Sequence, residues 1–211
     1  MPQLSELTDA VTVGKKNEVV RITQELLAAG TAPQAIVEQG LVPGMAIVGD
    51  RFKRNEIFVP EMLIAARAMK EALKLLEPLL VQAGIAPKYT AIIGTVQGDL
   101  HDIGKNLVAM MWRGANFNIV DLGTNVSPEK YVEAARQHKA NLVGLSALLT
   151  TTMPAMKSTV ELLRAAKLEG VKIMVGGAPV TEQFAKEIGA DAYSADAGSA
   201  VDVAKALVEA A

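Results

Sequence analysis

The stretch TAIIGTVQGDLHDIGKN at residues 90–106 contains three local patterns that decide how the second half of the chain folds. Residues 90–96 form a short apolar run, which is typical of a buried parallel strand. Residues 97–104 contain two glycines and two aspartates, the composition of a tight loop. A helical pattern begins near Lys105, so the stretch predicts a strand, a loop and a helix in succession.

The same alternation continues toward residue 211. Further strands are predicted at residues 118–121, 142–146, 172–176 and, more weakly, 190–193. Helices are predicted at residues 105–114, 128–138, 154–169, 181–188 and 201–210. Five strands alternating with five helices predict an α/β fold with a doubly wound, five-stranded parallel sheet of Rossmann or flavodoxin type. Such a sheet binds ligands at the carboxyl ends of its strands, so the expected site comprises residues 97–104, 147–152 and 177–179.

The first half of the chain shows helical patterns only. Helices are predicted at residues 4–13, 18–29, 33–40, 43–53 and 60–83. Glycines stand at expected helix ends and prolines in expected first turns: Gly30, Gly40, Gly84, Pro33, Pro43 and Pro60. We therefore predict a helical bundle over residues 1–86 and a sheet domain over residues 87–211, joined by a linker near residues 85–89.

Composition excludes several kinds of function. The net charge of −2 argues against nucleic acid as a main partner, because phosphate binding needs a clustered basic surface. The absence of cysteine excludes thiolate metal sites, iron–sulfur clusters, disulfides and cysteine nucleophiles. No apolar run approaches the roughly 18 residues that a membrane span requires. The first residues lack the pattern of a secretory signal, so we expect a cytoplasmic protein without a membrane partner.

His101 is the strongest candidate metal ligand. It stands two residues after Asp99, a spacing that lets the carboxylate accept from one imidazole nitrogen while the other points outward. The only other histidine is His138, and a protein zinc site needs three or four ligands. A macrocyclic cofactor such as haem or corrin needs only one more ligand from the protein. From this spacing alone, an ordinary histidine on a surface loop is the default interpretation, and only further motifs can favour a metal ligand.

Three sequence elements at the ends of predicted strands resemble those of cobalamin-binding domains. Residues 99–104 match D-x-H-x-x-G, Ser146-Ala147-Leu148 matches S-x-L, and Gly176-Gly177 matches G-G. The N-terminal bundle, including residues 56–62, looks like the helical cap that precedes this domain in corrinoid methyl carriers. The resemblance covers essentially the whole chain. It implies a corrinoid protein of a three-component methyltransferase system that demethylates methanol, methylamines or methoxylated aromatics.

The resemblance implies a role for each motif residue. His101 would replace the cofactor's own base beneath cobalt, the base-off/His-on state, with Asp99 behind it. Thr152 would extend this relay where the family often has a serine, and Ser146 or Thr150 would hydrogen-bond the cofactor's tail. The other residues expected to contact the cofactor are Met62, Gln97, Gly98, Asp102, Ile103, Gly104, Leu148, Gly176, Gly177 and Tyr193.

Local interpretations of some of these residues remain open. The three threonines at residues 150–152 also fit a helix N-cap. Met62, expected by resemblance to cover the upper face of cobalt, also fits core packing of the bundle. Asp102 fits the start of the next helix, and Lys105 and His138 fit solvated positions.

The implied function is that of a methyl carrier without catalytic residues of its own. A substrate:corrinoid methyltransferase would load cobalt(I), a methylcorrinoid:tetrahydrofolate or thiol methyltransferase would unload methyl-cobalt(III), and a reductive activator would restore oxidised cobalt. A mutase would need a large barrel, for which the chain is too short. A cobalamin-sensing regulator is an alternative, but it would be expected to have a DNA-binding helix-turn-helix or a basic surface, and the sequence indicates neither. A flavodoxin-like protein without a corrinoid is a further alternative, but it would leave the three motifs unexplained.

Overall fold

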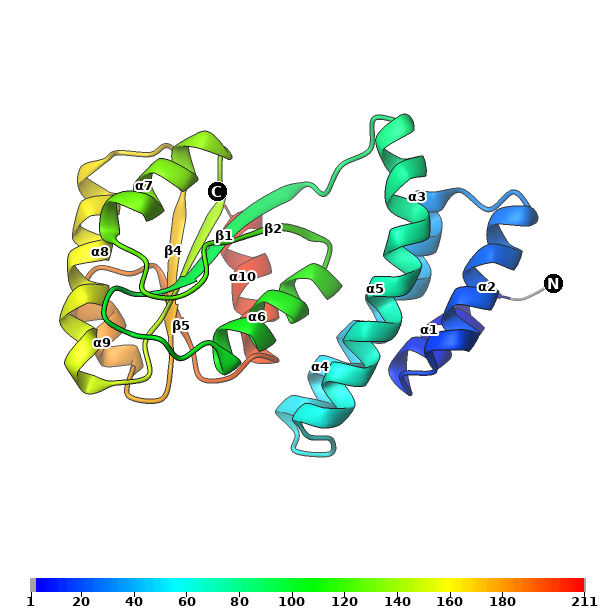
Figure 1. Cartoon of the computed structure of the whole chain (residues 1–211), viewed down its shortest axis with the longest axis horizontal. Helices are drawn as coiled ribbons and strands as arrows, with labels where there is room; N and C mark the ends of the chain where they lie inside the picture. The colour runs from blue at the N-terminus through cyan, green and yellow to red at the C-terminus, as the bar shows by residue number, and fades with distance from the viewer. Residues whose placement is uncertain (1–2, 211) are drawn as a thin grey trace. The chain divides into compact units, whose positions relative to one another are not determined.

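The computed structural model describes residues 3–210, which form two compact units (Figure 1). The helical unit comprises residues 3–88 together with Arg113–Asn116. The sheet unit comprises Tyr89–Trp112 together with residues 117–210. Each unit has its own arrangement of elements and is described separately.

The helical unit confirms the predicted bundle. Its elements are α1 (Leu4–Thr12), α2 (Lys16–Ala28), α3 (Pro33–Ile36), a π-helical turn η1 (Val37–Leu41), α4 (Val42–Lys53) and α5 (Val59–Gln82). Apolar side chains at helical spacing are buried on each helix, among them Leu7, Ile22, Met45, Met62 and Leu76. At the start of α5 the backbone N–H of Phe58 donates to the Glu61 carboxylate at 3.1 Å, which satisfies one of the free donors of a helix N-terminus.

The predicted helix end at Gly40 is wrong. Helical structure runs without interruption from Pro33 to Lys53, and Gly40 lies inside the π-helical turn. A Cβ at Gly40 would lie 2.7 Å from Leu7 Cδ2, and the Gly40 carbonyl accepts the Thr8 hydroxyl at 2.9 Å. Gly40 therefore lets α1 approach closely. The wider turn also accommodates Pro43, whose ring would clash with a carbonyl one α-helical turn earlier.

The sheet unit confirms the predicted parallel sheet. The strands are β1 (Tyr89–Thr95), β2 (Phe117–Asp121), β3 (Leu142–Ser146), β4 (Lys172–Gly176) and β5 (Ala192–Ser194). All neighbouring strands pair in parallel, in the order β2-β1-β3-β4-β5. This is the flavodoxin-like strand order.

Helices cover both faces of this sheet (Figure 1). On one face lie α7 (Pro128–Gln137), α8 (Met153–Ala165) and α9 (Glu182–Glu187), and on the other lie α6 (Ile103–Gly114) and α10 (Ser199–Glu209). Tyr131, Met156 and Val160 pack with Val143 and Val175 of the sheet. The inner strands β1, β3 and β4 are mostly buried, which explains their largely apolar sequences.

The strand order brings the predicted loops together. The chain leaves β1 toward β2 on one side and reaches β3 on the other, so the ligand crevice of this fold lies between β1 and β3. Beyond the strand ends, the Val96 N–H donates to Ser146 O at 3.0 Å and the Ala147 N–H donates to Gly176 O at 3.2 Å. These bonds hold the three motif-bearing loops side by side.

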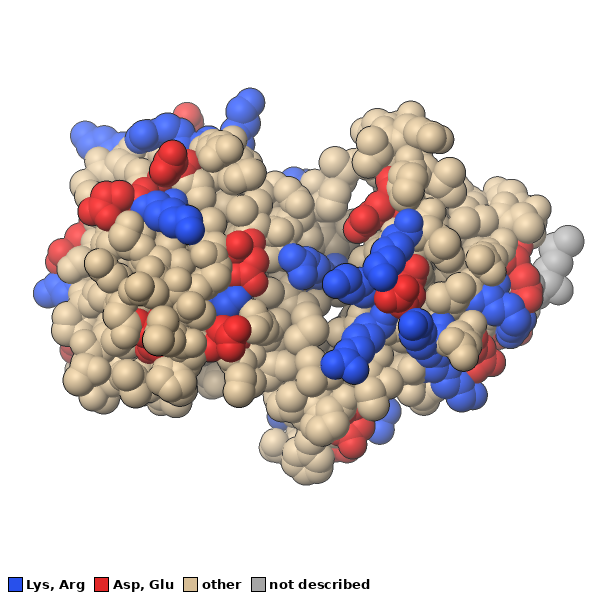
Figure 2. All heavy atoms as spheres, in the orientation of Figure 1, with Lys and Arg blue, Asp and Glu red and all other residues tan. Residues whose placement is uncertain are grey.

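Charged side chains of both signs are spread over the face of the molecule in Figure 2. Between residues 3 and 210, no helix combines the length and the apolar character needed to cross a membrane.

Candidate functional site

The site centres on the side chains of Asp99 and His101 at the end of β1. His101 Nδ1 lies 2.8 Å from Asp99 Oδ1, and the His101 backbone N–H donates to the same oxygen at 3.0 Å. A carboxylate can only accept, so the imidazole proton lies on Nδ1 and the lone pair on Nε2. The His101 side chain is 51% exposed while that of Asp99 is fully buried. The local spacing thus produces the predicted pair, with one ring nitrogen anchored and the other available.

Asp99 also binds the loop after β3. Its Oδ2 accepts the Leu148 N–H at 2.7 Å, the Leu149 N–H at 3.3 Å and the Thr152 hydroxyl at 2.8 Å. Burial raises the pKa of Asp99, but the hydrogen bonds from Leu148, His101 and Thr152 outweigh it and hold this pKa well below its ordinary value. Asp99 is therefore a carboxylate that joins two loops.

The structure shows which hydrogen bonds the Thr152 side chain makes. Residues 150–152 form a short 3-10 turn before α8, and the Thr152 side chain makes no helix cap. Its buried hydroxyl donates to Asp99, as the resemblance implied. Thr150 is exposed, and its predicted contact with a cofactor tail stays a prediction.

The rim around His101 is apolar and exposed. Leu100 and Ile103 are 72% and 75% exposed, and Leu148 and Leu149 are 43% and 41% exposed. Gln97, Gly98 and Gly104 of the same loop are also exposed. Large apolar side chains grouped at this exposure indicate a surface that binds something.

Asp102 and Lys105 anchor the start of α6. The Asp102 backbone carbonyl accepts the Asn106 N–H at 2.8 Å, and the Asp102 carboxylate accepts the Asn106 side-chain amide at 2.9 Å, as expected of a residue that begins a helix. The prediction of a solvated Lys105 is wrong. Its side chain is 2% exposed, and its ammonium group lies 2.6 and 2.7 Å from the two carboxylate oxygens of Asp121. This ion pair ties the first turn of α6 to the end of β2.

A Lys105→Met variant is expected to lower the free energy of unfolding by about 2 kcal/mol. The apolar stem fits the buried position, but Asp121 loses its ammonium partner and keeps the Gly123 N–H at 2.9 Å. The cost stays moderate because the Asp121 side chain is 30% exposed and regains water. Urea denaturation checks this, with Lys157→Met as the control, because the exposed pair of Lys157 and Glu161 at 3.9 Å is worth under about 0.5 kcal/mol. Equal destabilisation by both variants would contradict the role of the buried pair.

The loops after β3, β4 and β5 form a row at the same edge of the sheet. Ser146 is in register with Gly176, and Gly176 with Ser194. A Cβ at Gly177 would lie 1.9 Å from Ala147 O, and Gly177 has a φ of +127°. The backbone packing of this loop thus requires a glycine at residue 177, whatever ligand lies beside it.

Two predicted residues belong to elements other than the loops after β1, β3 and β4. Met62 is a buried residue of α5 in the helical unit, and its role as a cover of cobalt stays a prediction. Tyr193 is a half-buried residue of β5 that packs against the core of the sheet unit. Its predicted contact with the tail also stays a prediction.

Sequence reasoning missed several contributors. The Leu149 N–H binds Asp99, and Ser194 extends the row formed by Ser146 and Gly176. Thr95 and Asn125 hydrogen-bond the loop that carries His101. The signal for Thr95 was a hydroxyl at the end of an apolar strand. Asn125 had only the turn-like segment around it.

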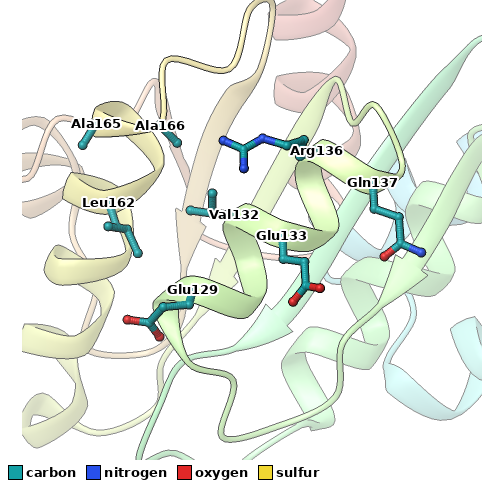
Figure 3. Close-up of a pocket in the computed structure, with 8 residues that line it drawn as sticks. All are labelled: Glu129, Val132, Glu133, Arg136, Gln137, Leu162, Ala165 and Ala166. Atoms are coloured by element: carbon teal, nitrogen blue, oxygen red, sulfur yellow. The ribbon is translucent and has the colours of Figure 1, made fainter.

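A surface groove lies elsewhere in the sheet unit, between α7 and α8 (Figure 3). It has a volume of about 680 Å³, and it is lined by Glu129, Val132, Glu133, Arg136, Gln137, Leu162, Ala165 and Ala166. None of the predicted site residues lines it. The candidate site is therefore the exposed surface around His101.

The described residues bring no group of three or more histidine, aspartate and glutamate side chains together as a metal site. A lone available nitrogen such as His101 Nε2 instead suits a metal whose other ligands come from a macrocycle. The buried Asp99 carboxylate behind it is the arrangement that fixes the tautomer of a metal-bound histidine. The residues present therefore fit a corrin cobalt.

Comparison with known proteins places this chain in a family. Two models described as B12 binding domain match residues 3–77 and 89–204. The chain is 41% identical over 208 residues to dimethylamine corrinoid protein 1 of Methanosarcina acetivorans, covering 97% of each. Among solved structures, it is similar to a cobalamin-binding protein of Desulfitobacterium hafniense, with a TM-score of 0.82, 28% identity and coverage of 99% of this chain and 100% of that one. It is also similar to the methanol:cobalamin methyltransferase complex of Methanosarcina barkeri, with a TM-score of 0.86, 28% identity and coverage of 99% and 80%. The chain therefore belongs to the corrinoid proteins, with matches to B12-binding domain models over both of its units.

Proposed function

We propose that this chain is a methyl carrier in which His101 Nε2 binds cobalt from below, in place of the cofactor's own base. The observation that carries the proposal is the half-exposed imidazole whose Nδ1 is held 2.8 Å from a buried carboxylate. It lies beside the β1/β3 crevice, where this fold binds its ligands. Relatives that match nearly the whole chain carry corrinoid in their names, which agrees with this assignment.

The residues around His101 would hold the cofactor by two kinds of contact. Leu100, Ile103, Leu148 and Leu149 would cover apolar parts of a corrin ring and lose their exposure to water. Ser146, Thr150, Gly176 and Gly177 would accommodate the displaced tail, with hydroxyls to bind it and glycines to leave room. When bound, the cobalt supplies a nucleophile that takes a methyl group from one partner and gives it to another.

The protein itself would hold the proton of the His101 imidazole on Nδ1 and fix the orientation of that ring. Asp99 keeps the imidazole proton on Nδ1, so Nε2 stays free to act as a ligand. Thr152 and the two backbone N–H groups keep Asp99 ionised and in place. Removing a partner behind a metal-bound histidine typically costs about 10–100-fold in affinity or activity.

The proposal includes partners and location. A substrate:corrinoid methyltransferase would load the carrier, and a tetrahydrofolate or thiol methyltransferase would unload it. A reductive activator would return oxidised cobalt to use. One relative was solved as a methanol:cobalamin methyltransferase complex, which supports a partner of the first kind. The cysteine-free composition fits work in the cytoplasm.

The test is cobalamin binding by the full chain and by His101→Ala. Wild-type protein mixed with hydroxocobalamin and separated from excess is expected to keep about one cofactor per chain, with an absorption spectrum changed from that of free cofactor. His101→Ala is expected to bind at least about 10-fold more weakly, because losing the ligand should cost no less than losing the partner behind it. Its spectrum should be that of cofactor with its own base or water beneath cobalt. His138→Ala removes the only other histidine and is expected to behave as wild type. The proposal fails if the chain stays colourless, or if His101→Ala matches wild type in both affinity and spectrum.

A further inference from the structure

The loop that carries His101 is not held by side-chain packing. All five residues from Leu100 to Gly104 are exposed. Leu100 and Ile103, on either side of the ligand, are among the most exposed apolar residues of the described chain. The place of the imidazole in space therefore depends on the hydrogen bonds of the loop backbone.

Two residues outside the three sequence motifs make these bonds. The buried Thr95 hydroxyl donates to the carbonyl oxygen of His101 itself at 2.9 Å. Asn125 bonds the loop twice: its side-chain oxygen accepts the Gly98 N–H at 2.8 Å, and its backbone N–H donates to Asp99 O at 2.9 Å. Asn125 adopts a φ of +53°, a conformation that asparagine tolerates better than most residues.

The bracing residues are themselves fixed to the sheet. The Thr95 N–H donates to Gly123 O at 2.9 Å, and the Val126 N–H donates to Thr95 O at 3.0 Å. The loop after β2 is thus paired to the end of β1 on both sides of Asn125. Asp99 fixes the His101 ring from the β3 side, while Thr95 and Asn125 fix its backbone from the β2 side.

We infer that Thr95 and Asn125 are positioning residues that set where His101 Nε2 meets cobalt. The inference rests on the proposed function and deepens it. A coordinate bond tolerates only a few tenths of an ångström in the position of the ligand. Loosening the backbone without touching the ring, Asp99 or the apolar rim should therefore weaken histidine coordination and leave the rest of the cofactor contacts in place.

The variants are chosen to remove one hydrogen bond each. Thr95→Val keeps the buried shape and loses the hydroxyl, and Thr95→Ser restores a hydroxyl. Asn125→Gly keeps the positive φ and loses the side-chain acceptor, and Asn125→Asp restores an acceptor. Two controls match them. Thr159→Val removes another buried hydroxyl that donates to a backbone carbonyl, and Asn55→Gly changes another asparagine with positive φ.

The readout identifies the ligand directly. The full chain is produced with 15N-labelled histidine, loaded with unlabelled cobalamin and reduced to cobalt(II). In electron paramagnetic resonance spectra, a 15N ligand splits each line into two, whereas the cofactor's own 14N base splits it into three. The fraction of doublet is followed from pH 7 downward, and cofactor retention and thermal unfolding are measured on the same samples.

Thr95→Val and Asn125→Gly are each expected to reduce the ratio of histidine-bound to unbound cobalt about 5-fold, the effect of one hydrogen bond. A proton competes with cobalt for His101 Nε2, so acid removes the doublet. Coordination that is 5-fold weaker raises the pH at which half the doublet is lost by about 0.7 units, because one pH unit corresponds to a tenfold change in proton concentration. Thr95→Ser, Asn125→Asp and both controls should keep the wild-type midpoint. Unchanged midpoints in Thr95→Val and Asn125→Gly, or equal shifts in the controls, overturn the inference. If the wild type itself shows no doublet, the proposed function is wrong.

Discussion

An Asp99→Asn variant is expected to lose about 3 kcal/mol of unfolding free energy at pH 7. The two carboxylate oxygens accept five donors, from His101, Leu148, Leu149 and Thr152. An amide group in the same buried position brings two donors of its own, so at least one N–H or hydroxyl loses its acceptor. Urea denaturation followed by circular dichroism measures the loss.

The difference in unfolding free energy between wild type and Asp99→Asn should decrease in acid. The pKa of Asp99 in the folded protein lies below its unfolded value of about 3.9, so its stabilising contribution is complete above about pH 5. This contribution decreases as the pH falls through 4 toward the lower folded pKa. The difference in stability between wild type and Asp99→Asn should therefore shrink over that range.

Asp102→Asn provides the matched control for both measurements. Asp102 is exposed, and its carboxylate accepts the side-chain amide of the neighbouring Asn106 at 2.9 Å. We expect this variant to stay within about 0.5 kcal/mol of wild type at every pH. If the stability difference between Asp99→Asn and wild type does not change between pH 7 and pH 3, the ionised carboxylate of Asp99 does not stabilise the loops after β1 and β3.

A Gly177→Ala variant is expected to lose about 3 kcal/mol of unfolding free energy. The added Cβ would lie 1.9 Å from Ala147 O, so the loops after β3 and β4 would have to separate. The φ of +127° adds backbone strain for any residue with a side chain. Separation should also disturb the Leu148 N–H that binds Asp99, so cobalamin affinity should decrease along with stability.

Gly170→Ala is the control that separates the backbone strain of a positive φ from the steric clash of the added Cβ. Gly170 has a φ of +71°, and a Cβ there would meet no atom within 4 Å. This variant should lose only about 1 kcal/mol and keep full affinity for cobalamin. Equal losses in the two variants would mean that the contact with Ala147 contributes nothing.

The inner strands of the sheet could be predicted from sequence because they are mostly buried. Residues 142–146 and 172–176 are continuous apolar runs, and the predicted bounds agree with those of β3 and β4. Gly40 could not be predicted in the same way. Its place inside a helix depends on contacts with Leu7 and Thr8, more than thirty residues earlier in the chain.

In the site, too, local contacts could be predicted and contacts that depend on the tertiary fold could not. Asp99 and His101 are two residues apart, so their contact follows from local geometry and could be predicted. The environment of Lys105 could not, because burial beside Asp121 depends on how α6 packs against the end of β2. Asn125 binds backbone groups of another loop, and no side-chain pattern indicates such a bond before the fold is known.

The Asp99 carboxylate should couple cobalt coordination at His101 to binding of the cofactor's tail in the crevice. One anion holds both the imidazole and the backbone at Leu148, so neither loop can shift without changing the other's hydrogen bonds. Occupation of the crevice beside Leu148 should then alter the readiness of Nε2 to donate its lone pair. By thermodynamic reciprocity, coordination at Nε2 should tighten or loosen the crevice by the same factor.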